Sequence, residues 1–471
     1  MNKTQSDKVA GNSGYNLSYV IFISCVAAIG GFLFGFDSAV INGTVAAIGK
    51  AFQSTAVGTG FSVASMLLGC AIGAIYAGNW ADKFGRKPVM TIASILFLIS
   101  ALGSGLATTS SVFIVFRLLG GLAVGGASVI APAYISEIAP AKIRGRLTSL
   151  QQMAIVLGIC VAFLSNYLIG RGAGSASNLF WGGFAAWKWM FWMECIPAIV
   201  YLILSLIVPE SPRYLITIRK DSLAKKVLYK VWGRTGIDEQ VEAIKETVNR
   251  ERKPRFSDIF QNGRLLPIVW VGIALSVFQQ FVGINVIFYY GAVLWEAAGF
   301  SEQNALLINV ISGIVNVSST VAAIMLIDKI GRKPLLIMGS IGMTITLGTV
   351  ALVFGTAAKS ATGQLALSTG AATTALIAAH LYIVSFGISW GPVVWVLLGE
   401  MFNNKIRGAA ISLAASMQWV ANFAVTMTFP VIASSAGMFG AYALYAMFAF
   451  ISIFFVAKYV RETKGMTLEE M

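Results

Sequence analysis

Charged residues are scarce in this chain. Of its 471 residues only 11% are charged, whereas 57% are hydrophobic. Soluble domains carry about 25% charged residues, so the composition excludes an ordinary soluble domain. Apolar runs of about 20 residues, the length that spans a bilayer as a helix, recur along the whole chain. The sequence therefore predicts a polytopic membrane protein.

Histidine and cysteine are almost absent as well. The single histidine, His380, has no second candidate ligand or nucleophile near it in the sequence. The four cysteines lie in apolar segments, without the spacing of a metal site or of a disulfide framework. We therefore expect free buried thiols and a packed histidine, and we expect no metal, no cofactor and no enzymatic activity.

The formal net charge of +14 is distributed unevenly. Lysine and arginine gather in alternate loops between the apolar runs, and the intervening loops carry few cations. This alternation follows the positive-inside rule and places both termini in the cytoplasm. It also argues against a nucleic-acid partner. Residues 1–16 are polar and lack a basic segment before an apolar core, so we expect a disordered cytoplasmic N-terminus and no signal peptide.

Hydropathy predicts an all-α membrane protein with twelve transmembrane helices. The expected spans are 17–43, 58–80, 89–108, 111–135, 147–169, 187–208, 265–294, 304–327, 334–356, 371–398, 408–431 and 437–459. They form an N-terminal six-helix bundle over 17–208 and a C-terminal one over 265–459. Residues 209–264 are polar and predict a cytoplasmic helical linker, and 460–471 predict a cytoplasmic tail.

Three motifs occur twice, about 250 residues apart. The sequence ADKFGRKP at 81–88 returns as IDKIGRKP at 327–334, and EIAPAKIRG at 137–145 returns as EMFNNKIRG at 400–408. PESPR at 209–213 is echoed by RETKG at 461–465. A shared offset indicates two halves of the same topology. Parallel six-helix halves are the architecture of the major facilitator fold.

Each repeated motif sets acids beside arginines at the cytoplasmic ends of helices. The planar guanidinium matches a carboxylate in a bidentate, directional way. We interpret these groups as a cytoplasmic latch that is closed in the outward-facing state and broken in the inward-facing state. The alternative is that they only determine topology and tie loops. The latch candidates are Asp82, Arg86, Glu137, Arg144, Glu210, Arg213, Asp328, Arg332, Glu400 and Arg407.

Asp37 stands in the middle of the first apolar run. An acid at the centre of a membrane helix costs about 2.5–3.5 kcal/mol on insertion scales and marks a functional site with a partner. Counting residues from the predicted helix ends places Arg117 and Glu194 at a similar depth. The arginine keeps its proton and holds a neighbouring carboxylate ionised until something competes. We interpret the three as a proton-coupling site; the alternative is a static buried ion pair.

Neutral amides are concentrated in the second half, where Asn285 takes the position that Asp37 has in the first. Buried amides are costly unless they are hydrogen-bonded. Amides together with flat aromatic faces suit an uncharged, polyhydroxylated ligand, so we predict a sugar. For any one amide, a hydrogen bond between helices is the alternative. The candidates are Gln151, Gln152, Gln279, Gln280, Asn285, Asn316, Gln418 and Asn422, with Trp395 and Trp419 beside them.

The chain resembles the sugar porter family of the major facilitator superfamily over nearly its whole length. The matching motifs lie at 82–86, 209–213, 279–285, 391–395 and 462–465. The resemblance is greatest to bacterial sugar–proton symporters of the glucose or xylose type. It implies that an acid at position 37 pairs with Arg117, with the acid Glu194 nearby, and that Tyr289 and Tyr290 belong to an outer gate. It also implies that the sugar is held by Gln152, Gln279, Gln280, Asn285, Asn316, Gln418 and Asn422, with its ring against Trp395.

We therefore expect a proton-coupled hexose importer, with glucose the first candidate, that works by alternating access in a bacterial inner membrane. Its expected partners are a monosaccharide, protons and the lipid bilayer, and we expect a monomer. Ile159 stands where the xylose symporter has a sugar-facing glutamine, which favours a hexose. A facilitative uniporter is the first alternative, and a non-transporting sugar sensor is the second.

Overall fold

The structure is a computed structural model that describes residues 15–140, 143–233, 236–250, 256–359, 365–403 and 406–464. The described chain is nearly all helical, and twelve of its helical spans are long and apolar enough to cross a membrane. Two short antiparallel hairpins, β1 (Phe260–Gln261) with β2 (Arg264–Leu265) and β3 (Ala358–Lys359) with β4 (Leu365–Ala366), are its strands. The predicted class, an all-α membrane protein with twelve spanning helices, is confirmed.

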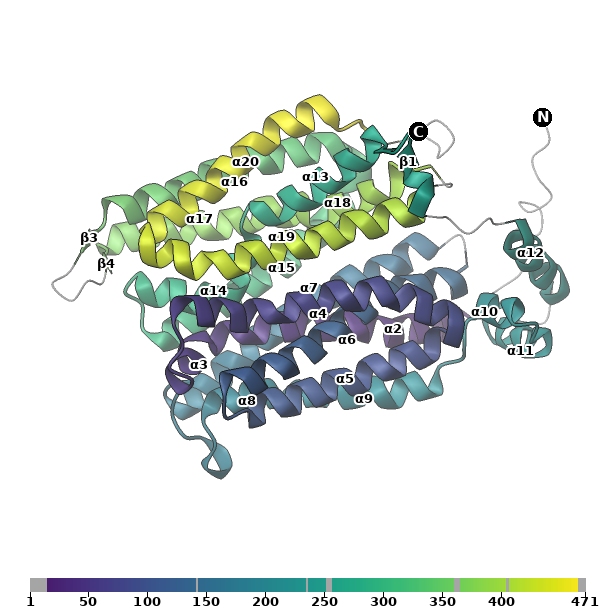
Figure 1. Ribbon diagram of the computed structural model, residues 1–471, viewed down its shortest axis with the longest axis horizontal. Coiled ribbons are helices and arrows are strands. Elements are labelled where there is room, and N and C mark those ends of the chain that lie inside the picture. Colours follow the sequence, from purple (N-terminus) through teal and green to yellow (C-terminus); the bar gives the residue numbers. More distant parts are fainter. Residues whose placement is uncertain are drawn as a thin grey trace.

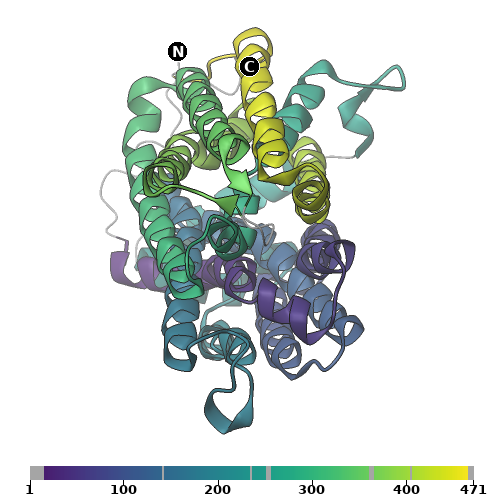
Figure 2. The same ribbon diagram turned by 90° about the vertical axis from the view of Figure 1, so that its left-hand side faces the viewer.

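The helices form two layers, one from each half of the chain (Figure 1, Figure 2). The first half contains α2 (Leu17–Val40), η1 (Ile41–Gly43), α3 (Val45–Ala51), α4 (Ala56–Phe84), α5 (Arg86–Leu106), α6 (Ser110–Ile138), α7 (Arg144–Ala173), η2 (Trp181–Gly183), α8 (Ala186–Trp192) and α9 (Cys195–Ile207). The second contains α13 (Pro267–Phe281), α14 (Ile284–Ala297), α15 (Glu302–Ile330), α16 (Arg332–Thr356), α17 (Thr369–Ile388), α18 (Trp390–Glu400), α19 (Arg407–Ser435) and α20 (Gly437–Tyr459).

In the sequence, the two halves are joined by α10 (Pro212–Thr217), α11 (Asp221–Trp232), α12 (Ile237–Arg250) and η3 (Phe256–Ile259). Helices α10 to α12 project from one end of the molecule (Figure 1). We call this the linker end, and we call the opposite end, where α3 and the β3–β4 hairpin lie, the far end. The spanning helices run between these two ends (Figure 1), so the line that joins the ends follows the membrane normal.

Helix starts repeat between the halves. Thr55 and Thr109 cap α4 and α6, and Ser301 and Ser368 cap α15 and α17, each by accepting a hydrogen bond from a backbone N–H three residues further on. Hydroxyl side chains are preferred at this position because they satisfy N–H groups that have no partner inside the helix. The second and fourth spanning helices of each half therefore begin in the same way, as the internal repetition implies.

Two glycines make equivalent turns at the linker end. Gly85, between α4 and α5, has φ 101°, and Gly331, between α15 and α16, has φ 107°. Residues with a Cβ rarely adopt this conformation. A Cβ at Gly331 would also lie 2.7 Å from Oε2 of Glu462, and a Cβ at Gly85 would meet the carboxylate of Glu210. Glycine is therefore required at each turn for two reasons, the backbone conformation and the lack of space for a Cβ.

Three of the predicted spans contain a helix break. The chain turns between α13 and α14 at Gly283, with φ 86°, and between α17 and α18 at Ser389, whereas between α8 and α9 only the regular hydrogen bonding is interrupted and Glu194 keeps helical dihedral angles. Pro197 lies in the first turn of α9, where a missing N–H is tolerated. Breaks at membrane depth free backbone groups and are typical of transporter binding sites. The predicted acid Glu194 and the amides around Gly283 lie at such breaks.

Candidate functional site

Asp37 of α2 and Arg117 of α6 form the ion pair that the sequence predicts. Asp37 is 0% exposed and Arg117 is 1% exposed. Arg117 Nη1 donates to Asp37 Oδ1, and Nη2 donates to the carbonyl oxygen of Asp37 at 3.2 Å. Removing one partner of such a pair leaves an uncompensated buried charge, which is strongly destabilising. The two helices are therefore tied at this point by charge as well as by packing.

Apolar and small residues complete the surroundings of Arg117. Its Nη2 lies 2.9 Å from Met66 Sδ, and its guanidinium carbon lies 5.6 Å from the ring centre of Phe191. Gly120 follows one turn later, and a Cβ there would lie 2.8 Å from Asp37 Oδ2. Sequence reasoning missed these three residues, although a glycine three positions after a buried arginine was an available signal for Gly120.

Glu194 lies at the α8–α9 break and is 0% exposed. The charges of Asp37 and Arg117 both act on its carboxylate, so the structure brings the three predicted residues together. Among the residues that the structure describes, no N–H or O–H group donates to Asp37 Oδ2 or to either oxygen of Glu194, but the two carboxyl groups lie close enough to share a hydrogen bond when one of them is protonated. The site thus combines two buried acids with one guanidinium.

Four predicted amides form one hydrogen-bonded network with Gln279 at its centre. Gln279 of α13 is 2% exposed, and its Nε2 donates to the carbonyl oxygen of Trp390 at 2.8 Å. Its Oε1 accepts from Gln418 Nε2 at 2.6 Å and from Gln280 Nε2 at 3.2 Å. Asn285 in turn donates to Gln280. The network joins α13, α14, α18 and α19 around the two helix breaks of the second half.

The two tyrosines predicted as an outer gate tie α14 to α19 in this structure. Asn422 Nδ2 lies 3.4 Å from the Tyr289 hydroxyl, and Asn422 Oδ1 accepts from the Thr426 hydroxyl at 3.1 Å. The Tyr290 hydroxyl donates to the carbonyl oxygen of Thr426 at 2.9 Å. These bonds lie within the second half, so the gate role of the tyrosines remains a prediction.

The other predicted sugar contacts are Asn316, Gln152 and Trp395. Asn316 is buried in α15, Gln152 is half-buried on α7, and Trp395 is 40% exposed on α18. Within the described ranges, their side chains make no hydrogen bond to the network. Gln151, next to Gln152, is buried instead and packs against Gly31, and neither of its amide atoms has a partner among the described residues. The sugar-binding role of Gln152, Asn316 and Trp395 therefore remains a prediction.

The repeated charges at the linker end form two equivalent clusters. Arg86 of α5 pairs with Glu137 of α6 at 2.8 Å and with Asp82 of α4 at 3.3 Å. The other cluster consists of Arg332, Glu400 at 2.8 Å and Asp328 at 3.0 Å. In each half, the arginine of one repeated motif therefore pairs with the glutamate of another: Arg86 with Glu137, and Arg332 with Glu400.

The remaining latch candidates are Arg407, Arg144 and Arg213. Arg407 Nε donates to the carbonyl oxygen of Phe402 at 3.3 Å and does not contact Glu400. The side chain of Arg144 lies outside the description, and so does the partner of Arg213. Arg86 and Arg332 tie helices of one half in this structure, which both the latch in its broken state and purely structural ties allow, so the latch role remains a prediction.

Two glutamates bind the turns beside these clusters. Glu210 accepts hydrogen bonds from the backbone N–H groups of Arg86 and Lys87, and Glu462 accepts from those of Arg332 and Lys333. Burial raises the pKa of Glu210 above its ordinary value. Burial also acts on Glu462, but four backbone N–H donors outweigh it and leave the pKa of that carboxyl below its ordinary value. Sequence reasoning missed Glu462, although its motif echoes that of Glu210.

The two glutamates predict opposite pH dependences of stability. A raised pKa in the fold means that the folded state binds the proton of Glu210 more tightly, so its contribution is lost as the pH rises above about 4.5. A lowered pKa means that the contribution of Glu462 is lost as the pH falls below about 4.5. We expect Glu210→Gln to reduce the loss of thermal stability above that pH and Glu462→Gln to reduce the loss below it. Unfolding temperatures of both variants across pH 3 to 7 check this, and equal pH profiles of the two would contradict it.

Contacts between the halves gather toward the far end. Asn42 in η1 is 1% exposed; its Nδ2 donates to the carbonyl oxygen of Phe288 at 2.9 Å, and its Oδ1 accepts from Ala292 N at 3.0 Å and from Asn309 Nδ2 at 2.7 Å. The rings of Phe163 and Phe288 also meet across the halves, 6.2 Å apart. The far end is therefore closed in this structure. Sequence reasoning missed Asn42, an amide five residues after Asp37.

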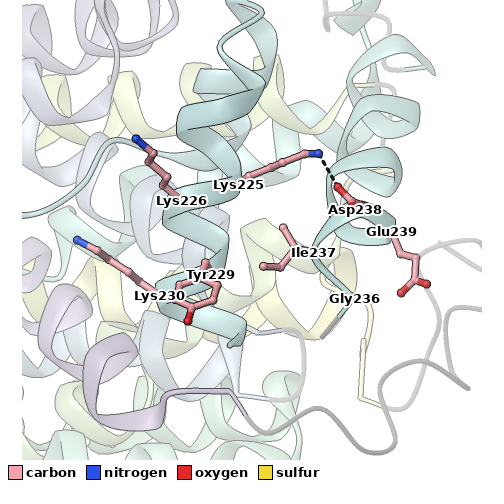
Figure 3. A pocket seen from close by; sticks show the side chains of 8 residues that line it. All are labelled: Lys225, Lys226, Tyr229, Lys230, Gly236, Ile237, Asp238 and Glu239. Carbon is pink, nitrogen blue, oxygen red and sulfur yellow. Dashed lines mark ion pairs between the residues drawn. The ribbon is translucent and has the colours of Figure 1, made fainter. Parts of the chain in front are cut away.

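A surface pocket of about 740 Å³ lies in the linker, between α11 and α12. Its lining includes Lys225, Lys226, Tyr229 and Lys230, and Figure 3 shows Lys225 reaching across to Asp238, with which it forms an ion pair of 2.5 Å. None of the predicted site residues lines this pocket. It is a feature of the linker surface and not part of the buried site.

Two six-helix halves of repeated topology, with buried charges and amides at helix breaks, define a secondary transporter of the major facilitator type. The family described as "Sugar (and other) transporter" matches residues 23–471. The protein belongs to this family, which confirms the recognition made from the motifs.

Relatives and solved structures agree with this membership. The chain is 56% identical to the "Glucose transport protein" of Synechocystis sp., over 97% of each chain. It is 39% identical to the "D-xylose-proton symporter" of Escherichia coli, over 98% of this chain and 96% of that one. The inward-open structure of the E. coli xylose transporter matches with a TM-score of 0.82 and 38% identity, over 96% of this chain and 99% of that one. These likenesses also confirm the major facilitator fold.

Proposed function

We propose that this protein is a proton-coupled sugar importer of the plasma membrane, with glucose as the first candidate substrate. The observation that carries the proposal is the buried site in which Arg117 pairs with Asp37 and a second buried acid, Glu194, lies beside the pair. The names of its relatives, a glucose transport protein and a xylose–proton symporter, support both parts of the proposal.

The charge balance of the buried site favours a bound proton. Two carboxylates can carry two negative charges, whereas Arg117 supplies one positive charge. A buried charge without a partner is costly, so the site is most stable when one of the acids is protonated. Release of that proton frees a carboxylate to compete for Arg117 and thereby changes how α2, α6 and the α8–α9 break are tied together. A change in protonation is thus converted into a change in helix packing.

The amide network supplies the chemistry that a sugar requires. An amide offers both donors and an acceptor but does not titrate, so it binds hydroxyl groups regardless of pH. Gln418 Oε1 is buried and has no partner in the described part of the chain, which leaves an acceptor for a sugar hydroxyl beside Gln279. We infer that Gln280, Asn285 and Gln418 contact the sugar directly and that Gln279 holds them in position.

The orientation of the protein follows from its charges and contacts. The lysines and arginines of the two repeated turns, at 83–87 and 329–333, lie at the linker end, so we place that end and both termini in the cytoplasm. The bonds around Asn42 close the far end, which corresponds to an inward-facing state. The match to an inward-open xylose transporter supports this assignment. We propose that the protein works as a monomer. We also propose that it needs no cofactor, because the proton gradient supplies the energy.

Uptake of labelled glucose into proteoliposomes tests the proposal directly. With an imposed inward proton gradient, we expect accumulation above the external concentration and its collapse when a protonophore is added. Equilibration to the external level, independent of the gradient, would instead identify a uniporter in which Asp37 and Arg117 form a structural pair. Uptake of xylose in the same vesicles compares a pentose with a hexose. Vesicles without protein give the background.

A further inference from the structure

The carboxylate of Glu302 bridges the two halves at the far end. Glu302 is the first residue of α15, in the second half. Its Oε2 accepts from the Ser175 hydroxyl and its Oε1 accepts from the backbone N–H of Ala176, both at 2.7 Å. Ser175 and Ala176 belong to the loop that follows α7 in the first half. Ser301 already caps α15, so the carboxylate of Glu302 is not needed for that purpose.

The loop that Glu302 binds also fixes the start of α8. The carbonyl oxygen of Ala176, a residue 3% exposed, accepts from the backbone N–H of Trp187 at 2.9 Å. Trp187 is the second residue of α8, and its ring packs against Phe191, the residue beneath the Arg117 guanidinium. Helix α8 ends two residues before Glu194. A short path of backbone and ring contacts thus runs from Glu302 to the buried acidic site.

The strength and exposure of these bonds suit a reversible tie. Hydrogen bonds to an ionised carboxylate are shorter and stronger than those between neutral groups. Glu302 and Ser175 are both partly exposed, so water can solvate the carboxylate once the tie breaks. Asn42 differs in this respect, because it is buried and its groups would have to be rehydrated. Of these two ties, that of Glu302 is therefore the one whose groups water can hydrate as soon as they begin to separate.

We propose that Glu302 is a positioning residue that locks the far end and holds α8 in place in the inward-facing state, and that its bonds to Ser175 and Ala176 break when the protein turns outward. The proposal rests on the alternating access of the proposed function. A ligand or bond specific to one state shifts the population toward that state in proportion to its differential free energy. Loss of the tie therefore shifts the protein toward the outward-facing state.

Cys160 is a native reporter for this shift. It lies on α7 against α15 of the other half, with its Sγ 3.3 Å from the position that a Cβ at Gly313 would take. In a background with Cys25, Cys70 and Cys195 changed to serine, labelling of Cys160 by a membrane-impermeant maleimide reports on access from one side. We expect Glu302→Gln to raise the labelling rate in right-side-out vesicles about tenfold and to lower it in inverted vesicles. Glutamine keeps the size of the side chain but turns an N–H group toward one of the two donors.

Two controls and the opposite changes in the two vesicle types make the test decisive. Glu242→Gln removes an exposed acid of the linker helix α12, which packs on α10 and α11, and should leave both rates unchanged. Ser175→Ala removes one of the two bonds of Glu302 and should change the labelling rates by an intermediate amount. In the Ser175→Ala background, Glu302→Gln should change the rates by less than it does in the wild type. A variant that unfolds would label faster from both sides, which separates misfolding from a shift of state. Wild-type rates in both vesicle types for Glu302→Gln would overturn the proposal. The labelling requires no sugar, so it can succeed or fail independently of the glucose uptake experiment.

Discussion

Asp37→Asn is expected to abolish uphill accumulation of sugar while preserving exchange of labelled sugar across the membrane. A proton that enters down 100 mV releases about 2.3 kcal/mol, enough for an accumulation of about fifty-fold when coupling is tight. Asparagine resembles the protonated acid in shape but cannot release a proton, so the variant should only equilibrate the sugar. Its accumulation ratio should fall from about fifty to about one.

The structure indicates that this variant can fold. Arg117 would lose its partner in Asp37, but Glu194 remains within electrostatic reach and can balance the guanidinium. Arg117→Leu leaves two buried acids without a cation, and we expect it to be the less stable protein. Parallel assays of gradient-driven uptake and of counterflow in proteoliposomes measure the two activities. Asp238→Asn, at an acid of the linker that is 84% exposed, serves as a matched control that should accumulate normally. Full accumulation by Asp37→Asn would show that the pair is structural.

Gln279→Leu is expected to produce the largest loss of sugar affinity. The substitution removes the acceptor for Gln280 and Gln418 and the donor to the carbonyl oxygen of Trp390. Each buried polar group that is left unpaired costs about 1–3 kcal/mol. The remaining amides would also lose the orientation that they need to bind hydroxyl groups. We expect the dissociation constant for glucose to rise by about 10-fold to 100-fold, since each 1.4 kcal/mol is a factor of ten.

The first half offers a matched control for Gln279. Gln151 is also a buried amide, but both of its amide atoms are unpaired in the described structure. Replacing it with leucine removes no hydrogen bond, so Gln151→Leu should bind glucose like the wild type and be at least as stable. Calorimetry of glucose binding and thermal unfolding of the two variants provide the comparison. Equal affinities of both variants would mean that the amides of the second half serve only as bonds between helices.

The hydropathy of the sequence was sufficient to predict the number and order of the spanning helices. Apolar runs of bilayer length form helices because every backbone group must be hydrogen-bonded within the membrane. The repeated motifs revealed the two halves because each copy makes the same turn, as Gly85 and Gly331 show. The meeting of Asp37, Arg117 and Glu194 was also predictable, since the rise along a helix gives the depth of each charge and a buried charge requires a partner.

Contacts that depend on the rotation of a helix about its axis could not be predicted in the same way. A membrane helix is apolar on all sides, so its hydropathy pattern does not reveal which face meets a neighbour. Gln151 and Gln152 are adjacent, yet packing buried the first against α2 and left the second half-buried. The sequence also could not predict that Gln279 lies at the centre of the amide network, because this depends on where α18 and α19 cross α13.

The sequence determined the membrane class, the duplicated topology and the chemistry available at each depth, because these depend on composition and on distance along one helix. The tertiary structure decided the pairings: Arg86 with Glu137, the amides around Gln279, and Asn42 and Glu302 across the far end. These pairings join residues far apart in the chain, and only the crossing and rotation of whole helices bring them within bonding distance.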